Sequence, residues 1–234
     1  MQVHKACAVF GRIGKDLEEF ENSGRVVVPP GKGGIMSELR YPVITISRQY
    51  AAYGRTVAKG LSEELGIPYY DKDVVRKTAE QSGFSEEDIR REGEDLSRAG
   101  KFMNDLLNNT ASYPSSHDRI FEAQKEVVLK LAEEPCIIVG RCADHILTQA
   151  GISAFRIFLY ADEEHRIRRA AELSENEGTD PKKAADRKEH LREVYYKTYT
   201  GVEMGRVSNY NICIDTGAVG VERCIRILSE ILKK

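Results

Sequence analysis

The sequence lacks a long apolar run and any surplus of basic residues. No hydrophobic stretch approaches the roughly 18 residues that a transmembrane helix needs, so we expect no membrane partner. The 35 Lys and Arg residues are balanced by 37 Asp and Glu residues, which argues against general nucleic-acid binding, because neutralising many phosphates requires excess positive charge. An apolar run after a basic start is also missing at the amino terminus, so we expect a cytoplasmic protein.

The motifs of several common kinds of site are also missing. The five histidines are scattered without HxxxH or HExxH spacing, so no zinc site is expected. The five cysteines include no CxxC pair, and four of them lie among apolar residues, as reduced core thiols do. No GxSxG motif is present, which argues against a hydrolase with a nucleophilic serine in that motif, the simplest hydrolase alternative.

From residue 42 onward, strand and helix patterns alternate. The expected strands are a β-branched run at 42–47, a short strand within 66–70, an apolar run at 136–139, and runs at 154–160 and 210–214. Helical spacing is found at 54–65, 73–81, after Gly83, near 121–131, and at 161–171, 183–199 and 221–232. This order predicts an α/β fold with a doubly wound five-stranded parallel sheet and flanking helices, in one domain over 42–234. Residues 1–41 are expected to form an amino-terminal extension.

The turn after the first strand resembles a phosphate-binding loop. Compared with GxxxxGK[ST], it keeps Gly54 and Thr56, replaces the lysine by Arg55 and replaces the first glycine by Gln49. Such a loop needs inward-pointing N–H groups, a cation and a hydroxyl for Mg²⁺ at a helix start. A plain strand-to-helix turn is the alternative.

Charged residues also follow the second and third strands. Asp71 and Lys72 come directly after the second strand, where ligands of parallel sheets bind. Asp73 and Lys77 are four residues apart, so a helix-surface ion pair is an alternative role for Lys77. Arg141 follows the third strand, and a guanidinium there must reach solvent, an acid or a ligand. A structural pair with Asp144 or Asp71 is its alternative role.

Two later helices are rich in basic residues, and the segment 174–181 between them breaks helical structure. Arg166 and Arg169 are three apart, and Lys188 and Arg192 are four apart. A solvated face paired with nearby glutamates is one interpretation, and a hinged lid that carries arginines to phosphates is the other. In the second, Arg192 contacts phosphate only when the lid is closed and contributes little to stability. The tyrosines at 195, 196 and 199 are expected to pack this helix on the core.

Several segments together resemble the cytidylate kinase-like family of P-loop nucleoside monophosphate kinases. The segments are 44–50, Gly54-Arg55, 65–72, 137–144, 158–162, 199–201 and 214–216, in order along the chain. The resemblance implies a P-loop kinase fold with an acceptor-binding insertion and a helical lid at about 170–195. It also implies ATP and Mg²⁺ as cofactors and nucleotides as substrates.

The resemblance also assigns roles to individual residues. It implies ATP binding by Gln49, Tyr50, Ala51, Ala52, Tyr53, Gly54, Arg55 and Thr56, with Thr56 at the metal; acceptor binding by Asp71, Lys72, Lys77, Gly140, Arg141 and Asp144; and catalysis by Arg55, Arg141, Arg166, Arg169 and Arg192. The family usually carries Gly-Ser-Gly-Gly-Arg where this chain has Ala-Ala-Tyr-Gly-Arg at 51–55, and often an Asp at the position of Val139.

The expected activity is ATP-dependent phosphoryl transfer to a nucleoside monophosphate, with CMP or dCMP as the acceptor. One alternative is a P-loop kinase of a small-molecule hydroxyl, in which Asp71 or Asp73 orients or deprotonates the acceptor. The other is a non-catalytic nucleotide-sensing module, which the altered turn and Val139 would accommodate. The sequence leaves the oligomeric state open.

Overall fold

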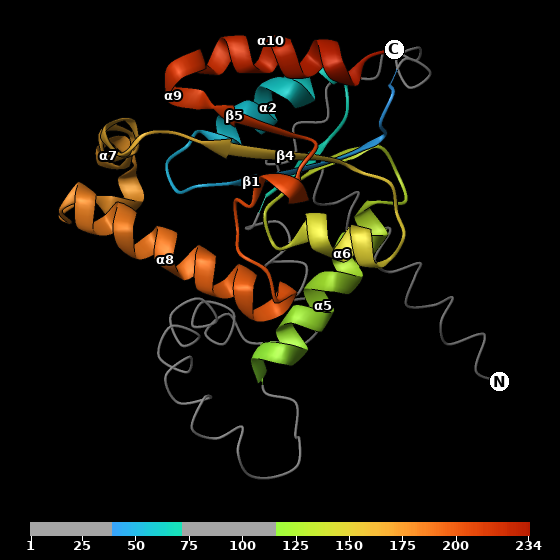
Figure 1. Ribbon diagram of the computed structural model, residues 1–234, viewed down its shortest axis with the longest axis horizontal. Coiled ribbons are helices and arrows are strands. Elements are labelled where there is room, and N and C mark those ends of the chain that lie inside the picture. The colour runs from blue at the N-terminus through green and yellow to red at the C-terminus, as the bar shows by residue number, and fades with distance from the viewer. Residues whose placement is uncertain (1–38, 72–115) are drawn as a thin grey trace.

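The structure is a computed structural model that describes residues 39–71 and 116–234 (Figure 1). The expected helices at 73–81 and after Gly83, together with the candidate residues Lys72, Asp73 and Lys77, lie outside the described residues. Within the described part, no helix combines the length and the apolar character needed to cross a membrane.

Five parallel strands form one sheet, which confirms the predicted fold class. They are β1 (Val43–Arg48), β2 (Tyr69–Tyr70), β3 (Cys136–Val139), β4 (Phe155–Tyr160) and β5 (Ile212–Asp215), in the order β2-β3-β1-β4-β5. Ile46 of β1 is aligned with Val139 of β3 and with Ile157 of β4. Because β1 is central, its carboxyl end lies between the carboxyl ends of β3 and β4, and residues that follow these strands come together.

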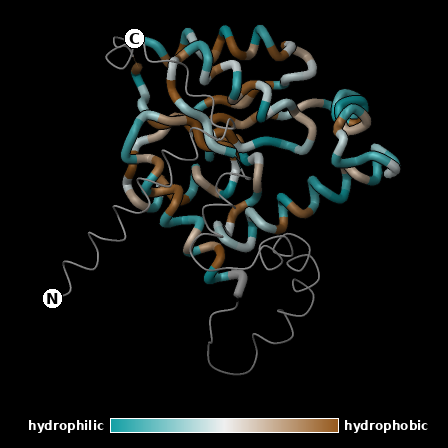
Figure 2. The backbone as a smooth tube through the Cα atoms, turned by 180° about the vertical axis from the view of Figure 1, so that it is seen from behind, coloured by the Kyte–Doolittle hydropathy of each residue, from teal (hydrophilic) through white to brown (hydrophobic). Residues whose placement is uncertain are grey.

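Helices cover both faces of the sheet (Figure 1), because alternate side chains of the buried strands point to opposite faces. Ile44 and Ile46 pack with α2 (Gly54–Leu65) and α10 (Val221–Leu232). Val43 packs instead with α5 (Ser116–Leu131) and α6 (Ala143–Gln149). Figure 2 shows the hydrophobic stretches concentrated where the strands run, between these two layers.

The two basic helices are α7 (Glu163–Glu172) and α8 (Pro181–Thr200), separated by a 3₁₀ turn at Ser174–Asn176. Helix α8 starts two residues earlier than expected, because Asp180 caps it by accepting from the N–H of Lys183 and Pro181 occupies its first position. Its carboxyl-terminal part packs on α5, where the Tyr199 ring stacks on Phe121 with centroids 4.0 Å apart. Tyr196 is buried, so the expected packing role of these tyrosines is confirmed.

Two short helices were not expected from the sequence. Helix α6 follows β3 after the turn at 140–142, and α9 (Thr216–Val219) follows β5 directly. The second is one turn long and depends on Asp215, whose carboxylate accepts from the N–H groups of Gly217 and Ala218. A helix this short has no apolar periodicity to recognise.

Residues just before position 42 pack on the domain. Leu39 is 6% exposed and forms an antiparallel bridge with Lys233, and the Tyr41 ring lies 4.9 Å from that of Phe155. We expect Leu39→Ala to lower the free energy of unfolding by about 2–4 kcal/mol, as for other buried leucines. Urea unfolding measures this. Val207→Ala, at a side chain that is 71% exposed, is the control and is expected to change stability by less than about 0.5 kcal/mol. Equal midpoints for parent and Leu39→Ala would contradict the packing role.

Candidate phosphate-binding site

The turn between β1 and α2 has a backbone conformation that favours glycine. Ala51 and Tyr53 have φ angles of 61° and 57°, in the left-handed region, although neither is a glycine. Tyr53 is the N-cap of α2 and makes no side-chain capping bond. The N–H groups of the first helical turn therefore point toward the space in front of the helix, where a phosphate is favoured. Arg55 and Thr56 are exposed in this first turn, so a cation and a hydroxyl accompany the N–H groups.

The left-handed conformation at Ala51 has a measurable cost. A residue with a Cβ pays about 1–2 kcal/mol there. Glycine avoids this cost, but part of the gain is lost because glycine gives up more backbone freedom on folding. We therefore expect Ala51→Gly to raise the free energy of unfolding by about 0.5–1 kcal/mol. Ala171→Gly, at an exposed position within α7, is the matched control and should lower it by about 1 kcal/mol. Thermal unfolding distinguishes the two, and a loss of stability in both would show that Ala51 is not strained.

Tyr50 connects this turn to α8. The Tyr50 side chain is 3% exposed, and its N–H donates to the Glu189 carboxylate at 2.5 Å. Its ring has the Lys188 ammonium and the Arg192 guanidinium each 5.0 Å from its centroid. Its hydroxyl donates to Glu175 at 2.6 Å. Tyr50, an expected ATP contact, is thus buried between the turn and α8.

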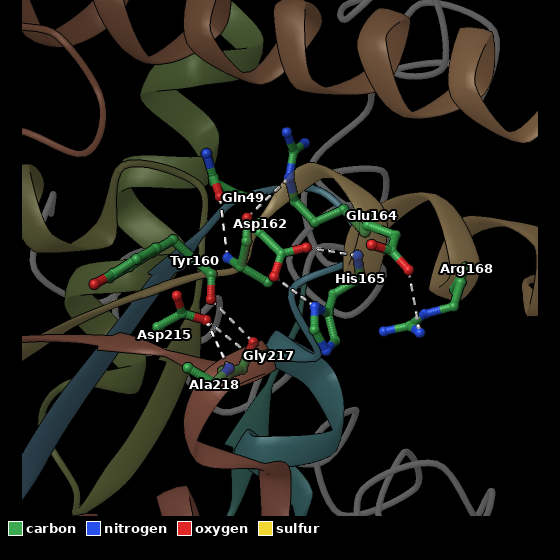
Figure 3. Close-up of polar contacts among 12 residues, drawn as sticks. Gln49, Tyr160, Asp162, Glu164, His165, Arg168, Asp215, Gly217 and Ala218 are labelled. Atoms are coloured by element: carbon green, nitrogen blue, oxygen red, sulfur yellow. Dashed lines mark hydrogen bonds and ion pairs between the residues drawn. The ribbon is translucent and has the colours of Figure 1, made fainter.

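The rest of the turn is attached to the ends of β4 and β5. The Gln49 amide oxygen accepts from the N–H of Ala161 at 3.2 Å (Figure 3). The Thr216 hydroxyl donates to the Ala52 carbonyl at 3.4 Å and to the Tyr160 carbonyl at 3.0 Å. Gln49 and Ala52, also expected ATP contacts, therefore position the turn through its neighbours.

Arginines from β1, α2, α8 and the turn after β3 lie at this edge of the sheet. Arg55 forms an ion pair with Asp71 at 2.9 Å, so two residues predicted for donor and acceptor binding lie together. Arg141 follows β3 with a φ of 57°, and its guanidinium lies 5.5 Å from the Tyr195 ring centroid. Arg48 ends β1, and the Arg192 guanidinium donates to its carbonyl at 3.5 Å. The site is therefore strongly basic, in a chain with a net charge of -2.

Arg192 is not the surface charge that the lid hypothesis expects. Its side chain is partly buried against Tyr50, and burial lowers the pKa of its guanidinium, although the nearby Glu189 carboxylate opposes this. Glu189 itself is buried, which raises its pKa, while the hydrogen bond from Tyr50 and the charges of Arg192 and Arg166 lower it. In the sequence, Glu189 is only one of the nearby glutamates of a solvated helix face, because its contact with Tyr50 joins residues 139 positions apart.

The two candidate arginines of α7 have different surroundings: one lies beside the turn between β1 and α2, and the other lies at the start of α7. Arg169 forms an ion pair with Glu172 at 2.7 Å and lies 5.0 Å from the Tyr53 ring centroid, directly beside the turn. Arg166 donates from Nε to the Ala161 carbonyl at 3.2 Å, at the base of the helix. The structure therefore brings Arg169 to the turn between β1 and α2, as it does Arg192.

Asp144 faces the core. It is 3% exposed and accepts from the Tyr196 hydroxyl at 2.8 Å, while its Oδ1 has no hydrogen-bond partner among the described residues. Burial raises the pKa of Asp144, which the bond from Tyr196 partly offsets. Burial and the charge of Asp144 raise the pKa of Tyr210 to about 12. The structure thus places Asp144 in a buried cluster with two tyrosines.

The raised pKa of Asp144 predicts a pH dependence of stability. Because the folded state binds this proton more tightly than the unfolded chain, stability falls as the pH rises from the unfolded pKa through the folded one. We expect Asp144→Asn to remove this loss, so that the variant melts above the parent at pH 8 and the gap narrows toward pH 5. Asp186→Asn, at an exposed site on α8, is the control. Parallel curves of melting temperature against pH for parent and Asp144→Asn would contradict this.

Two further acids lie at the ends of β4 and β5 and cap helices (Figure 3). Asp162 accepts from the N–H of His165 with one oxygen and contacts its Nδ1 at 2.6 Å with the other. The hydrogen bond from the N–H of His165 lowers the pKa of Asp162. Asp215 caps α9, beside Gly217. Both carboxylates are therefore engaged by N–H groups.

No cluster of three or more His, Cys, Asp or Glu side chains suited to a metal ion occurs within 39–71 and 116–234. Mg²⁺ would fit this site if phosphate oxygens of a bound nucleotide supplied most of its ligands. The exposed Thr56 hydroxyl would then be the ligand from the turn. The expected role of Thr56 is compatible with its position in the first turn of α2.

Comparisons with known proteins agree with the resemblance found in the sequence. The profile of the cytidylate kinase-like family matches residues 43–218. Cytidylate kinases from Thermoplasma volcanium and Methanothrix thermoacetophila are each 27% identical over 177 residues, covering 74% and 75% of this chain and 82% and 88% of their own. An uncharacterized protein from Eubacterium ventriosum superposes with a TM-score of 0.58 at 24% identity, over 81% of this chain and 96% of its own, which shows the shared fold.

Proposed function

Because the chain belongs to the cytidylate kinase-like family, we propose that it catalyses ATP-dependent phosphoryl transfer to a nucleoside monophosphate, with CMP or dCMP as the acceptor. The observation that carries the proposal is the glycine-type turn at the end of β1, which leads into α2 at Arg55 and meets Arg192 at the Tyr50 ring. Non-glycine residues in the left-handed region, such as Ala51 and Tyr53, cluster at functional sites, and this supports a binding role for the turn.

The turn and the start of α2 would bind the phosphates of ATP. The N–H groups of the first helical turn donate to phosphate oxygens, and the Arg55 guanidinium adds a cation at the position of the usual lysine. Thr56 would hold Mg²⁺, which when bound neutralises charge on the phosphates. The residues that preserve the geometry of this turn are Gln49, Tyr50 and Ala52, through their contacts with Ala161, Glu189 and Thr216.

The acceptor would bind between the ends of β2 and β3. Arg141 and Gly140 lie after β3, and Asp71 lies after β2 in an ion pair with Arg55. An acceptor phosphate is already a nucleophile, so the site needs no general base, and its work is to position the reactants and stabilise charge. An Asp71 carboxylate paired with a guanidinium suits positioning better than proton abstraction. Lys72 and Lys77, which lie outside the described residues, remain acceptor-side candidates, whereas the buried Asp144 accepts a hydrogen bond from Tyr196 instead of lining this region.

The lid would span about 170–195, within α7 and α8. Arg169 and Arg192 already lie at the turn, at the Tyr53 and Tyr50 rings. Small movements of these helices would bring both guanidinium groups onto the transferred phosphoryl group, where they stabilise charge only during transfer. Arg166, at the base of α7, would follow the same movement.

The test is a transfer assay with labelled ATP, Mg²⁺ and separate acceptors. We expect CMP and dCMP to be phosphorylated in preference to AMP, GMP and UMP. Transfer only to a metabolite hydroxyl would favour the small-molecule kinase. ATP binding without transfer to any acceptor would favour a nucleotide-sensing module, and either result would overturn the proposal.

A further inference from the structure

Arg48 is the last residue of the central strand, at the point where the phosphate turn begins. Its side chain runs past two glycines that belong to different halves of the site. A Cβ built on Gly54, at the start of α2, would lie 2.7 Å from the Cγ of Arg48. A Cβ built on Gly140, after β3, would lie 2.1 Å from one of its guanidinium nitrogens. Both glycines therefore leave space that the Arg48 side chain fills.

The path of this side chain connects the two candidate half-sites. Its aliphatic part lies over the start of α2, where the donor phosphates would bind, and its guanidinium lies over Gly140, beside Arg141. A group placed there is at the position between donor and acceptor phosphates, where a phosphoryl group would be transferred.

The electrostatic surroundings of Arg48 are unfavourable to a cation. Burial lowers the pKa of its guanidinium well below the ordinary value, and the charges of Arg192, Arg141 and Arg55 lower it further. The charge of Asp71 raises the pKa of Arg48, but the Asp71 carboxylate already pairs with Arg55 at 2.9 Å. A structural arginine would be expected beside an acid. The fold instead holds this one among like charges, which an anionic ligand would relieve.

From this geometry we propose that Arg48 is a phosphate-binding catalytic residue, whose guanidinium contacts the phosphoryl group in transit between the turn at α2 and the Gly140-Arg141 step. The catalytic role of Arg48 rests on the proposed function, whereas phosphate binding by Arg48 rests on the structure alone. Arg48 was not among the residues predicted from sequence. The signal was available, because a guanidinium at the end of a buried strand is the same feature that identified Arg141.

The test compares Arg48→Met and Arg48→Lys with the parent and with Arg226→Met, an exposed site on α10. Calorimetry with tripolyphosphate measures anion binding without any need for turnover. We expect Arg48→Met to raise the tripolyphosphate Kd at least about 10-fold and to lower kcat by about 10²- to 10³-fold, the effect of removing one charge-stabilising donor. Arg48→Lys should keep much of the binding and lose turnover, because an ammonium cannot donate in a planar fork. Arg226→Met should behave as the parent.

Thermal unfolding separates a binding role from a structural one. Without anion, we expect Arg48→Met to melt no lower than the parent, because removing Arg48 relieves repulsion. Added tripolyphosphate should raise the parent's melting temperature and shift that of Arg48→Met much less. Unchanged tripolyphosphate affinity in Arg48→Met, or no binding by the parent, would overturn the inference. Arg48-dependent anion binding without nucleotide phosphorylation would reject the proposed function and retain phosphate binding by Arg48.

Discussion

Replacing Arg55 by methionine is expected to lower kcat by about 10²- to 10³-fold and to change the free energy of unfolding by less than about 1 kcal/mol. The Arg55 side chain is 57% exposed, so its ion pair with Asp71 is screened by solvent and adds little to stability. In the proposed reaction, the same guanidinium lies at the start of α2, where negative charge redistributes during transfer. The loss should therefore be larger in kcat than in ATP affinity.

Lys59→Met is the matched control for Arg55→Met. Lys59 lies one turn further along α2, is 56% exposed and pairs with Glu63, so its removal also takes one exposed cation from this helix. Steady-state kinetics with saturating ATP and acceptor should show parent-like turnover for Lys59→Met. An equal, small effect of the two substitutions would mean that Arg55 contributes only to the general positive potential. Full activity of Arg55→Met would remove the turn from the catalytic site.

The strands were predictable from sequence because each one is a short apolar run in a regular alternation with helices. The predicted run at 136–139 coincides with β3, and that at 42–47 differs from β1 by one residue at each end. The fifth strand begins at Ile212, two residues later than expected. The preceding 3₁₀ turn, Val207–Asn209, ends with the N–H of Tyr210 bonded to the carbonyl of Val207. That local bond is not visible in a hydrophobic pattern.

The sequence was sufficient to predict which residues follow the strands and so form the site, but not which contacts these residues make. The sequence indicates that Arg55, Asp71 and Arg141 follow parallel strands, and the fold places them at one edge. It cannot indicate that Glu189 meets the N–H of Tyr50, because that bond depends on how α8 lies across the turn. Nor can it indicate that Ala51 and Tyr53 keep a glycine conformation, because the surroundings impose a backbone that these side chains disfavour.

Arg192→Met is expected to lower both turnover and stability, in contrast to Arg55→Met. Turnover should fall by about 10²-fold or more, because the guanidinium lies 5.0 Å from the Tyr50 ring centroid, beside the turn proposed to bind phosphate. The free energy of unfolding should fall by about 2 kcal/mol near neutral pH, because the buried Glu189 carboxylate loses its counter-charge. Steady-state kinetics and urea unfolding measure the two effects separately.

The stability loss should depend on pH. Burial already raises the pKa of Glu189, and removing Arg192 takes away a charge that lowers it. An acid with a raised folded pKa binds its proton more tightly in the folded state, so it destabilises the protein as the pH rises through that pKa. The deficit of Arg192→Met should therefore be small near pH 5 and larger at pH 8. A deficit that is constant over this range would mean that lost packing on Tyr50, and not the carboxylate, is its cause.

The double variant Arg192→Met/Glu189→Gln separates the electrostatic role from the catalytic one. Glutamine has an oxygen that can still accept from the N–H of Tyr50 but carries no charge, so most of the lost stability should return and the pH dependence should flatten. Turnover should stay low, because no guanidinium is restored at the turn. If turnover also returned, Arg192 would act only by neutralising Glu189, and the cation required for transfer would have to come from the other arginines at this edge of the sheet.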